Sequence, residues 1–170
     1  EPGISFERHL ASGSAWFGKV SAVGSYTAGT DAFDASNIGS VTAEEVYLGY
    51  RTKFAGDWDI EVSLGPRVLK LGTGMLIANG GSDGFERGAL KLGPREAWEK
   101  AAIVQLTGGG IKTTAFYMAP NEMPSNDTKN LLNGVDLRWD GKHGDYSGLT
   151  YIHVLKSEAA YPKAAPGGVG

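Results

Sequence analysis

The sequence predicts an all-β fold, an antiparallel up-and-down transmembrane β-barrel, with about eight strands in a single barrel segment over residues 1–170. Two observations predict it. Apolar and polar residues alternate with a period of two through most of the chain, which is the pattern of half-buried strands. The connections between these stretches are short at one end and long at the other, as in outer-membrane barrels. A content of 26 glycines also favours a turn-rich β-protein.

The alternation defines each strand in turn. In "DWDIEVSLG", every second residue from Trp58 to Leu64 is apolar, and those between are polar or small. In the last strand we place Tyr146 and Ile152 on the apolar face, which puts His153 on the charged face. The predicted strands are 3–10, 15–27, 44–54, 57–65, 101–107, 111–119, 133–141 and 146–155.

Aromatic residues stand near the ends of the apolar faces, as in the girdles of membrane barrels. They are Trp16, Tyr26, Tyr50, Trp58, Trp139 and Tyr146. The same alternation also fits a soluble antiparallel sheet with one face in water. The lengths of the connections, short at one end and long at the other, favour the membrane barrel over the soluble sheet.

The connections fall into two sets. The short ones are 10–14, 55–57, 108–110 and 141–144, and the three glycines at 108–110 predict a tight hairpin turn. The long ones lie near 28–43, 72–99, 120–130 and 157–170. The longest, "GTGMLIANGGSDGFERGALKLGPREAW", has no strand or helix period and lacks the motif of a phosphate-binding loop.

Composition excludes several classes of protein. The chain has no cysteine, which excludes disulfide scaffolds and thiolate chemistry, and its net charge of −3 argues against nucleic-acid binding. The chain contains no run of about 18 apolar residues, so the sequence predicts no transmembrane helix. No acid or histidine spacing matches a metal site, and no nucleophile motif is present. We therefore expect no metal, no cofactor and no enzymatic activity.

Long stretches of the chain resemble outer-membrane porins of the alginate-export type. The likeness runs from about residue 19 to 156 and is strongest over 62–98, in "SLGPRVLKLGTGMLIANGGSDGFERGALKLGPREAW". Two further segments carry it, "VSAVGSYTAGTDAFDASNIGSVTAEEVYLGYRTK" and "TTAFYMAPNEMPSNDTKNLLNGVDLRWDGKHGDYSGLTYIHV". Pro66 and Val68 depart from the family pattern, and a proline cannot donate to a strand ladder. We expect a bulged or edge-like strand there.

The resemblance implies a large barrel in the bacterial outer membrane, of which this chain would be an internal segment of about half. Its expected function is selective passive diffusion of small hydrophilic solutes through a water-filled lumen. The family name suggests an anionic solute, although the mixed charges do not require one. The expected partners are outer-membrane lipid, lipopolysaccharide and the solute itself.

Charged residues on the predicted lumen side are the candidate pore-lining or constriction residues, because wall charges and inward loops set selectivity. The basic candidates are Arg51, Arg67, Arg87, Arg95 and Arg138, and the acidic candidates are Asp59, Glu61 and Asp136. Two alternatives remain open. A soluble β-sandwich carbohydrate-binding module would bind its ligand with Trp16, Trp58 or Trp139, and a β-rich hydrolase would use acids such as Asp59 and Glu61 on one face of the sheet.

Overall fold

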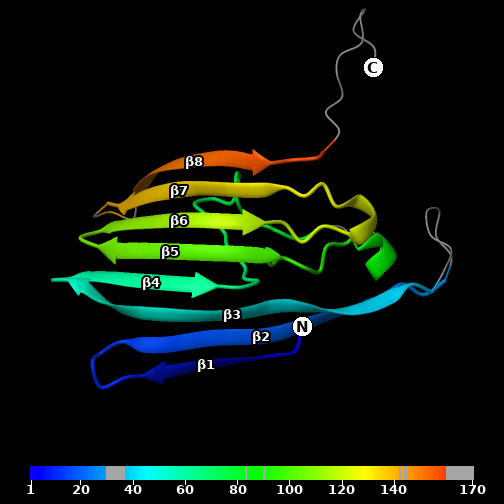
Figure 1. Ribbon diagram of the computed structural model, residues 1–170. Helices are drawn as coiled ribbons and strands as arrows, with labels where there is room; N and C mark the ends of the chain where they lie inside the picture. The colour runs from blue at the N-terminus through cyan, green and yellow to red at the C-terminus, as the bar shows by residue number, and fades with distance from the viewer. Residues whose placement is uncertain (30–36, 83, 90, 142, 144, 160–170) are drawn as a thin grey trace, which may run out of the picture.

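Eight strands form one antiparallel sheet in chain order (Figure 1). The computed structural model describes residues 1–29, 37–82, 84–89, 91–141, 143 and 145–159. The strands are β1 (Gly3–His9), β2 (Ala15–Tyr26), β3 (Gly39–Ala55), β4 (Trp58–Leu64), β5 (Lys100–Gly108), β6 (Ile111–Ala119), β7 (Leu131–Asp140) and β8 (Tyr146–Lys156). Two single-turn 3-10 helices, η1 (Phe85–Arg87) and η2 (Pro124–Asn126), lie in the connections. The predicted all-β, up-and-down arrangement of eight strands is confirmed. Within the described residues β1 and β8 do not pair, so closure into a barrel stays a prediction.

The short connections lie at one end of the sheet, the short-turn end, and the longer ones at the other, the long-loop end. The β5–β6 hairpin turns through Gly109 and Gly110, whose φ angles are 57° and 78°. Two consecutive residues with positive φ match a type I′ turn, which explains why glycine occupies both positions. The tight hairpin predicted here is confirmed.

Strand β3 begins five residues earlier than the alternation predicts, at Gly39. The connection predicted at 28–43 is therefore shorter than expected. Residues 30–36 of that connection, and residues 160–170 of the predicted tail, lie outside the described residues.

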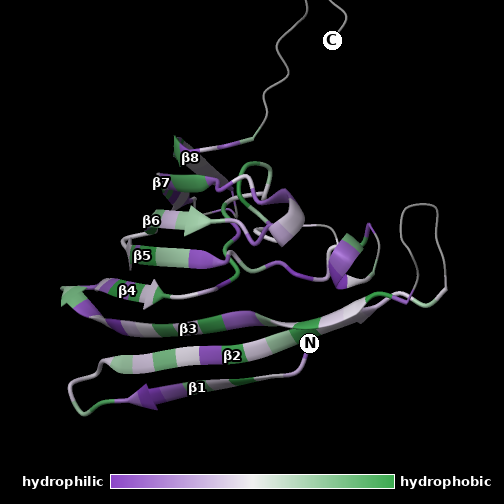
Figure 2. Ribbon diagram, turned by 45° about the vertical axis from the view of Figure 1, so that its right-hand side comes forward, coloured by the Kyte–Doolittle hydropathy of each residue, from purple (hydrophilic) through white to green (hydrophobic). Residues whose placement is uncertain are grey.

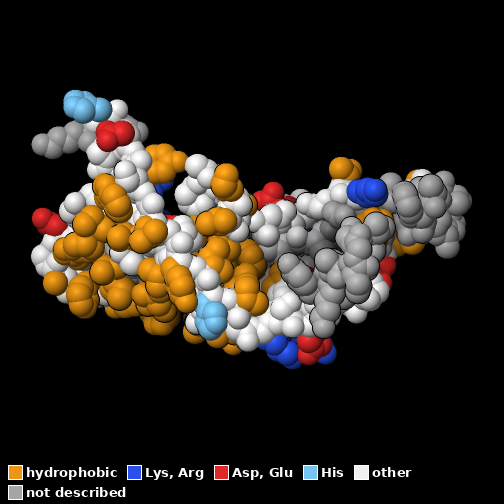
Figure 3. All heavy atoms as spheres, turned by 90° about the horizontal axis from the view of Figure 1, so that it is seen from above, with side chains coloured by type: hydrophobic (Ala, Val, Ile, Leu, Met, Phe, Trp, Pro, Cys, Tyr) orange, Lys and Arg blue, Asp and Glu red, His pale blue; other side chains and the backbone are white. Residues whose placement is uncertain are grey.

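The two faces of the sheet differ sharply in character. Cross-strand pairs such as Leu48 with Leu64, and Val62 with Val104, bring the predicted apolar residues together on one side, which we call the apolar face. Its exposed large side chains include Phe6, Trp16, Val20, Val46, Leu48, Val62, Leu64, Val104, Tyr117, Val135, Trp139, Leu149 and Tyr151. The alternation shows as bands of colour along β2 and β3 (Figure 2), and hydrophobic side chains gather broadly when the molecule is seen from the β8 edge (Figure 3).

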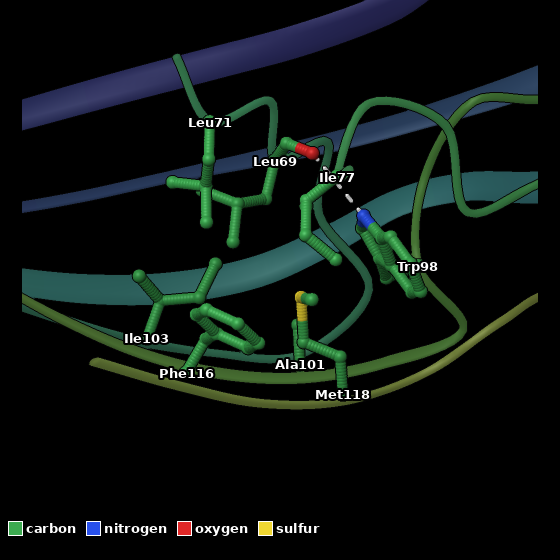
Figure 4. Packing of buried hydrophobic residues seen from close by; sticks show 8 residues of the cluster. All are labelled: Leu69, Leu71, Ile77, Trp98, Ala101, Ile103, Phe116 and Met118. Carbon is green, nitrogen blue, oxygen red and sulfur yellow. Dashed lines mark hydrogen bonds between the residues drawn. The ribbon is translucent and has the colours of Figure 1, made fainter. Parts of the chain in front are cut away.

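The opposite face is covered in part by residues 65–99, between β4 and β5, and we call it the loop face and this segment the covering loop. The core forms between the two (Figure 4). The loop contributes Leu69, Leu71, Ile77 and Trp98, and the sheet contributes Ala101, Ile103, Phe116 and Met118. Trp98 Nε1 also donates a hydrogen bond of 3.2 Å to the Leu69 carbonyl oxygen. The long loop is thus packed onto the sheet along its first part and at its end.

The face assigned to β8 from sequence is wrong. Thr150 is the register partner of Asp136 and donates a hydrogen bond of 2.6 Å to its Oδ1, so the series from Tyr146 to Val154 lies on the loop face. His153 pairs with Asn133 on the apolar face instead of standing among the charges. Both faces of this strand carry large apolar residues, so period alone does not distinguish them.

Candidate functional site

A β-bulge in β3 turns two consecutive glutamates toward the covering loop. The register between β2 and β3 shifts after Val20, so that Ser21 stands opposite both Glu44 and Glu45. The Glu45 amide donates a hydrogen bond of 3.1 Å to Ser21 Oγ. A bulge of this kind bends its strand and re-aims side chains. Both glutamates are consequently buried, with 2% and 7% of their surface exposed.

These carboxylates bind the backbone of the covering loop. Glu44 Oε1 accepts hydrogen bonds from the amides of Glu96, at 2.5 Å, and Ala97, at 2.7 Å. Glu45 Oε1 accepts one of 3.1 Å from the Val68 amide, and its carboxylate also pairs with Lys19. Hydrogen bonds to a charged acceptor are roughly twice as strong as neutral ones. One bulge therefore holds both the start and the end of the loop.

Arg95 holds the same part of the loop from the opposite direction. Its side chain is fully buried and donates to three hydroxyl groups of β2 and β3. They are Thr42 Oγ1 at 2.5 Å, Ser40 Oγ at 3.2 Å and Ser25 Oγ at 3.4 Å. Burial lowers the pKa of the Arg95 guanidinium, and nearby Arg87 lowers it further, while Glu44 opposes the shift. Arg95 is an anchor between loop and sheet.

Arg87 joins three parts of the chain. Its guanidinium donates to Asn121 Oδ1 at 2.9 Å and to the Glu122 carbonyl oxygen at 2.6 Å. Its own carbonyl oxygen accepts hydrogen bonds from Ser25 Oγ, at 2.6 Å, and Ser40 Oγ, at 2.9 Å. The covering loop is thereby fixed to the β6–β7 connection as well as to β2 and β3.

Glycines allow the close approach of these segments. A Cβ atom at Gly81 would lie 1.8 Å from the Arg95 carbonyl oxygen. At Gly88, where φ is 83°, a Cβ atom would lie 2.7 Å from the Ile38 carbonyl oxygen. The glycine-rich composition of the loop therefore serves backbone contact within the loop and against the sheet.

At the short-turn end the loop face carries charges of both signs. Arg51 pairs with Glu7, and Lys53 Nζ lies 3.2 Å from Asp59 Oδ1. Deeper along β4, Arg67 donates to Glu61 Oε1 at 3.0 Å. A cleft of about 440 Å³ opens here. Its charged and polar lining comprises His9, Arg51, Thr52, Lys53, Asp59, Glu61, Gln105 and Thr107.

A second charged group lies on β7. Arg138 donates to Asp140 Oδ1, with its Nη2 at 2.7 Å, and its guanidinium carbon lies 4.4 Å from the centre of the Tyr146 ring. Asp136 is buried and accepts from Thr150. A smaller cleft, of about 210 Å³, separates these residues from the covering loop at Gly72 and Leu76.

The structure brings the predicted site residues together in three places. Arg51, Asp59, Glu61 and Arg67 lie close to one another on β3, β4 and the start of the covering loop. Asp136 and Arg138 lie on β7. Arg87 and Arg95 lie in the loop and bind neighbouring segments. Their pore-lining roles stay predictions.

Sequence reasoning did not identify Glu44 and Glu45 as functional residues, nor the hydroxyl groups of Ser25, Ser40 and Thr42. One signal for the glutamates was present. Two consecutive acids interrupt the alternation in "TAEEVYLG", as a bulge does when it places neighbouring side chains on one face. The hydroxyl groups carried no comparable signal, since serine and threonine are common on any polar strand face.

No helix among the described residues is long and apolar enough to cross a membrane, and these residues contain no group of three or more acids or histidines placed to hold a metal ion. The sheet instead presents an exposed apolar face and a loop face with a charged cleft. Comparison with models of protein families, with curated proteins and with solved structures finds no match for this chain.

Proposed function

We propose that this protein forms part of the wall of a channel in the bacterial outer membrane, through which small hydrophilic solutes diffuse. One observation carries the proposal: the sheet exposes apolar side chains on one face, while β1 to β4, β6 and β7 carry charges on the other. A soluble sheet does not usually leave such a large apolar face uncovered. In a membrane barrel, lipid covers that face and water fills the other side.

The spacing of aromatic residues supports this orientation. Trp16 and Tyr26 lie on the apolar face of β2, ten positions apart. At about 3.3 Å per residue and a tilt of about 40°, this distance corresponds to a band of about 25 Å along the barrel axis. That is the height of the apolar band in outer-membrane barrels.

The open edges of the sheet add a requirement. Strands β1 and β8 each have one side without a partner strand among the described residues. Unpaired backbone groups are too costly in hydrocarbon, so a membrane-spanning form needs further strands to close the barrel. The proposal therefore concerns the assembled barrel in which this sheet forms one part of the wall.

The tryptophans favour lipid over carbohydrate as the partner of the apolar face. Trp16 pairs with Tyr50 on one side and with Arg8 on the other, and Trp139 pairs with Ile111 and with Ser147, so each tryptophan has one apolar and one polar neighbour across the sheet. A carbohydrate site needs polar groups beside the aromatic ring to bind the sugar hydroxyls. This face offers few of them.

Planar-bilayer recording tests the function. We expect the intact protein, purified in detergent, to produce stepwise conductance increases. Lys53→Glu should shift the reversal potential in a salt gradient toward cation preference, because Lys53 lies in the charged cleft. Lys129→Glu is the matched control, since Lys129 lies in the β6–β7 connection and pairs with Glu158.

Absence of conductance from protein that is inserted and folded would refute the channel function. Equal shifts of the reversal potential in the two lysine variants would still be consistent with a channel, but they would show that the charged cleft does not determine its ion selectivity.

A further inference from the structure

We infer that Glu44, supported by Glu45, is a positioning residue that fixes the covering loop against the wall and so sets the width of the channel. This inference rests on the proposed function for its consequence, the channel width. The attachment of the loop itself stands on the contacts of the described residues.

The two halves of the covering loop are held by different forces. Residues 65–78 contribute the buried side chains of Leu69, Leu71 and Ile77 to the core. In residues 79–97, the buried positions among those described are glycines, Arg95 and Ala97, while Leu92 is largely exposed. Hydrophobic burial therefore contributes little between residues 79 and 97, which depend on their polar contacts and on the core packing of Trp98 directly after them.

Among those polar contacts Glu44 holds a central place. Its Oε1 binds two successive amides, those of Glu96 and Ala97, and its Oε2 has no hydrogen-bond partner among the described atoms. All hydrogen bonding by this buried carboxylate is thus directed at the loop. Its negative charge also acts on the neighbouring buried guanidinium of Arg95, whose hydrogen-bond partners among the described residues are three hydroxyl groups. Loss of Glu44 would remove two backbone anchors and leave a buried cation less compensated.

The loop lies on the face that the proposed function assigns to the lumen. A loop fixed there by a rigid strand narrows the channel permanently, whereas a loop held by weak surface contacts would open and close. Because both glutamates project from a bulge in β3, the wall itself determines where the loop lies. We therefore expect a steady open-channel current from the native protein.

The experiment compares Glu44→Ala, Glu44→Gln and the control Glu99→Gln, which changes an exposed acid. The first readout is the rate of trypsin cleavage after Lys91, an exposed residue in the second half of the loop. Alanine removes both hydrogen bonds and the charge, and we expect cleavage to accelerate about 100-fold. Glutamine keeps an acceptor but not the charge, so we expect about a tenfold acceleration. The control should cleave at the native rate.

The second readout is single-channel conductance. We expect Glu44→Ala to increase the open-channel current and its noise, and Glu44→Gln to give a smaller increase. Circular dichroism checks that the sheet persists in each variant. If Glu44→Ala does not fold, the comparison of Glu44→Gln with Glu99→Gln tests the inference. Native cleavage rates in both Glu44 variants would overturn the inference. Faster cleavage with unchanged conductance would overturn its consequence for channel width, and a native protein without any conductance would instead count against the proposed function.

Discussion

Neighbouring residues of β5 provide a direct measurement of how differently the two faces are covered. Ile103 is 1% exposed and packs in the core beneath the covering loop, whereas Val104 is 39% exposed on the apolar face. Truncating each to alanine removes apolar groups from one strand at adjacent positions. Only Ile103→Ala leaves a cavity with fixed walls.

The magnitudes follow from the groups removed. Ile103→Ala deletes three methyl-sized groups at about 0.8 kcal/mol each, and the cavity term raises the cost to about 3–4 kcal/mol. Val104→Ala deletes two such groups that are about three-fifths covered, for about 1 kcal/mol. Lipid covering the apolar face raises this to at most about 1.6 kcal/mol, because fluid acyl chains fill the space and no cavity remains.

The assay is reversible urea unfolding in lipid vesicles or detergent, with the free energy of unfolding extrapolated to zero denaturant. Ile103→Ala should lower this free energy by at least about twice as much as Val104→Ala. Equal losses would refute the reasoning, since they would mean that the covering loop does not bury one face more firmly than the other.

Three further predictions concern packing, membrane contact and pH. Gly49→Ala should cost about 1–3 kcal/mol of unfolding free energy, because its Cβ would lie 2.1 Å from Phe17 Cζ, and a cost near zero would show that this ring moves freely. Trp98→Phe removes the tryptophan buried under the loop, so brominated acyl chains should then quench most of the remaining tryptophan emission; weak quenching would place the apolar face outside lipid. Hydrogen bonds from Lys129 and, to a smaller extent, Lys156 lower the pKa of Glu158 from 4.5 to about 2. Ionised Glu158 therefore stabilises the folded protein fully above pH 4.5, and this stabilisation is lost as the pH falls toward 2. An NMR titration should show the Glu158 midpoint rising in Lys129→Ala, and an unchanged midpoint would exclude Lys129 as the cause.

The strands can be predicted because the alternation of apolar and polar residues marks each strand, and turn residues such as glycine and proline mark where it ends. In β4, Ile60 and Val62 alternate with Asp59 and Glu61, and a glycine and a proline follow. The chain leaves the sheet there, with Gly65 at a φ of 113°. Local sequence contains all that this prediction needs.

The face of β8 and the bulge in β3 required information from neighbouring strands. Ile152 and Tyr151 are both apolar enough for either face, and only pairing with β7 decides between them. The shift at Glu44 and Glu45 is likewise a property of two strands together, since it depends on how Ser21 is opposed.

The contacts of the loop arginines were beyond sequence reasoning for a different reason. The sequence indicates that Arg87 and Arg95 could face a lumen, and nothing in it identifies their partners. Their hydrogen-bond partners Ser25 and Thr42 lie 62 and 53 positions away in the chain, on strands whose spatial relation to the loop is set by the whole sheet. A charge in a loop has no periodic signature that distinguishes an anchor from an exposed group.

The covering loop also has a consequence for the order of folding. Every strand pair in the sheet joins neighbours in the chain, and hairpins with short turns, such as β1–β2 and β5–β6, close quickly because little loop entropy is lost. Pairing of β4 with β5 is different, since it closes the covering loop itself. The loop anchors connect residues such as Glu44 and Ala97, which are 53 positions apart. Their acceptor is complete only after β2 and β3 have paired out of register to form the bulge. We therefore expect the short hairpins to form first, and docking of the second half of the covering loop to form a later and slower kinetic phase that Glu44→Ala weakens.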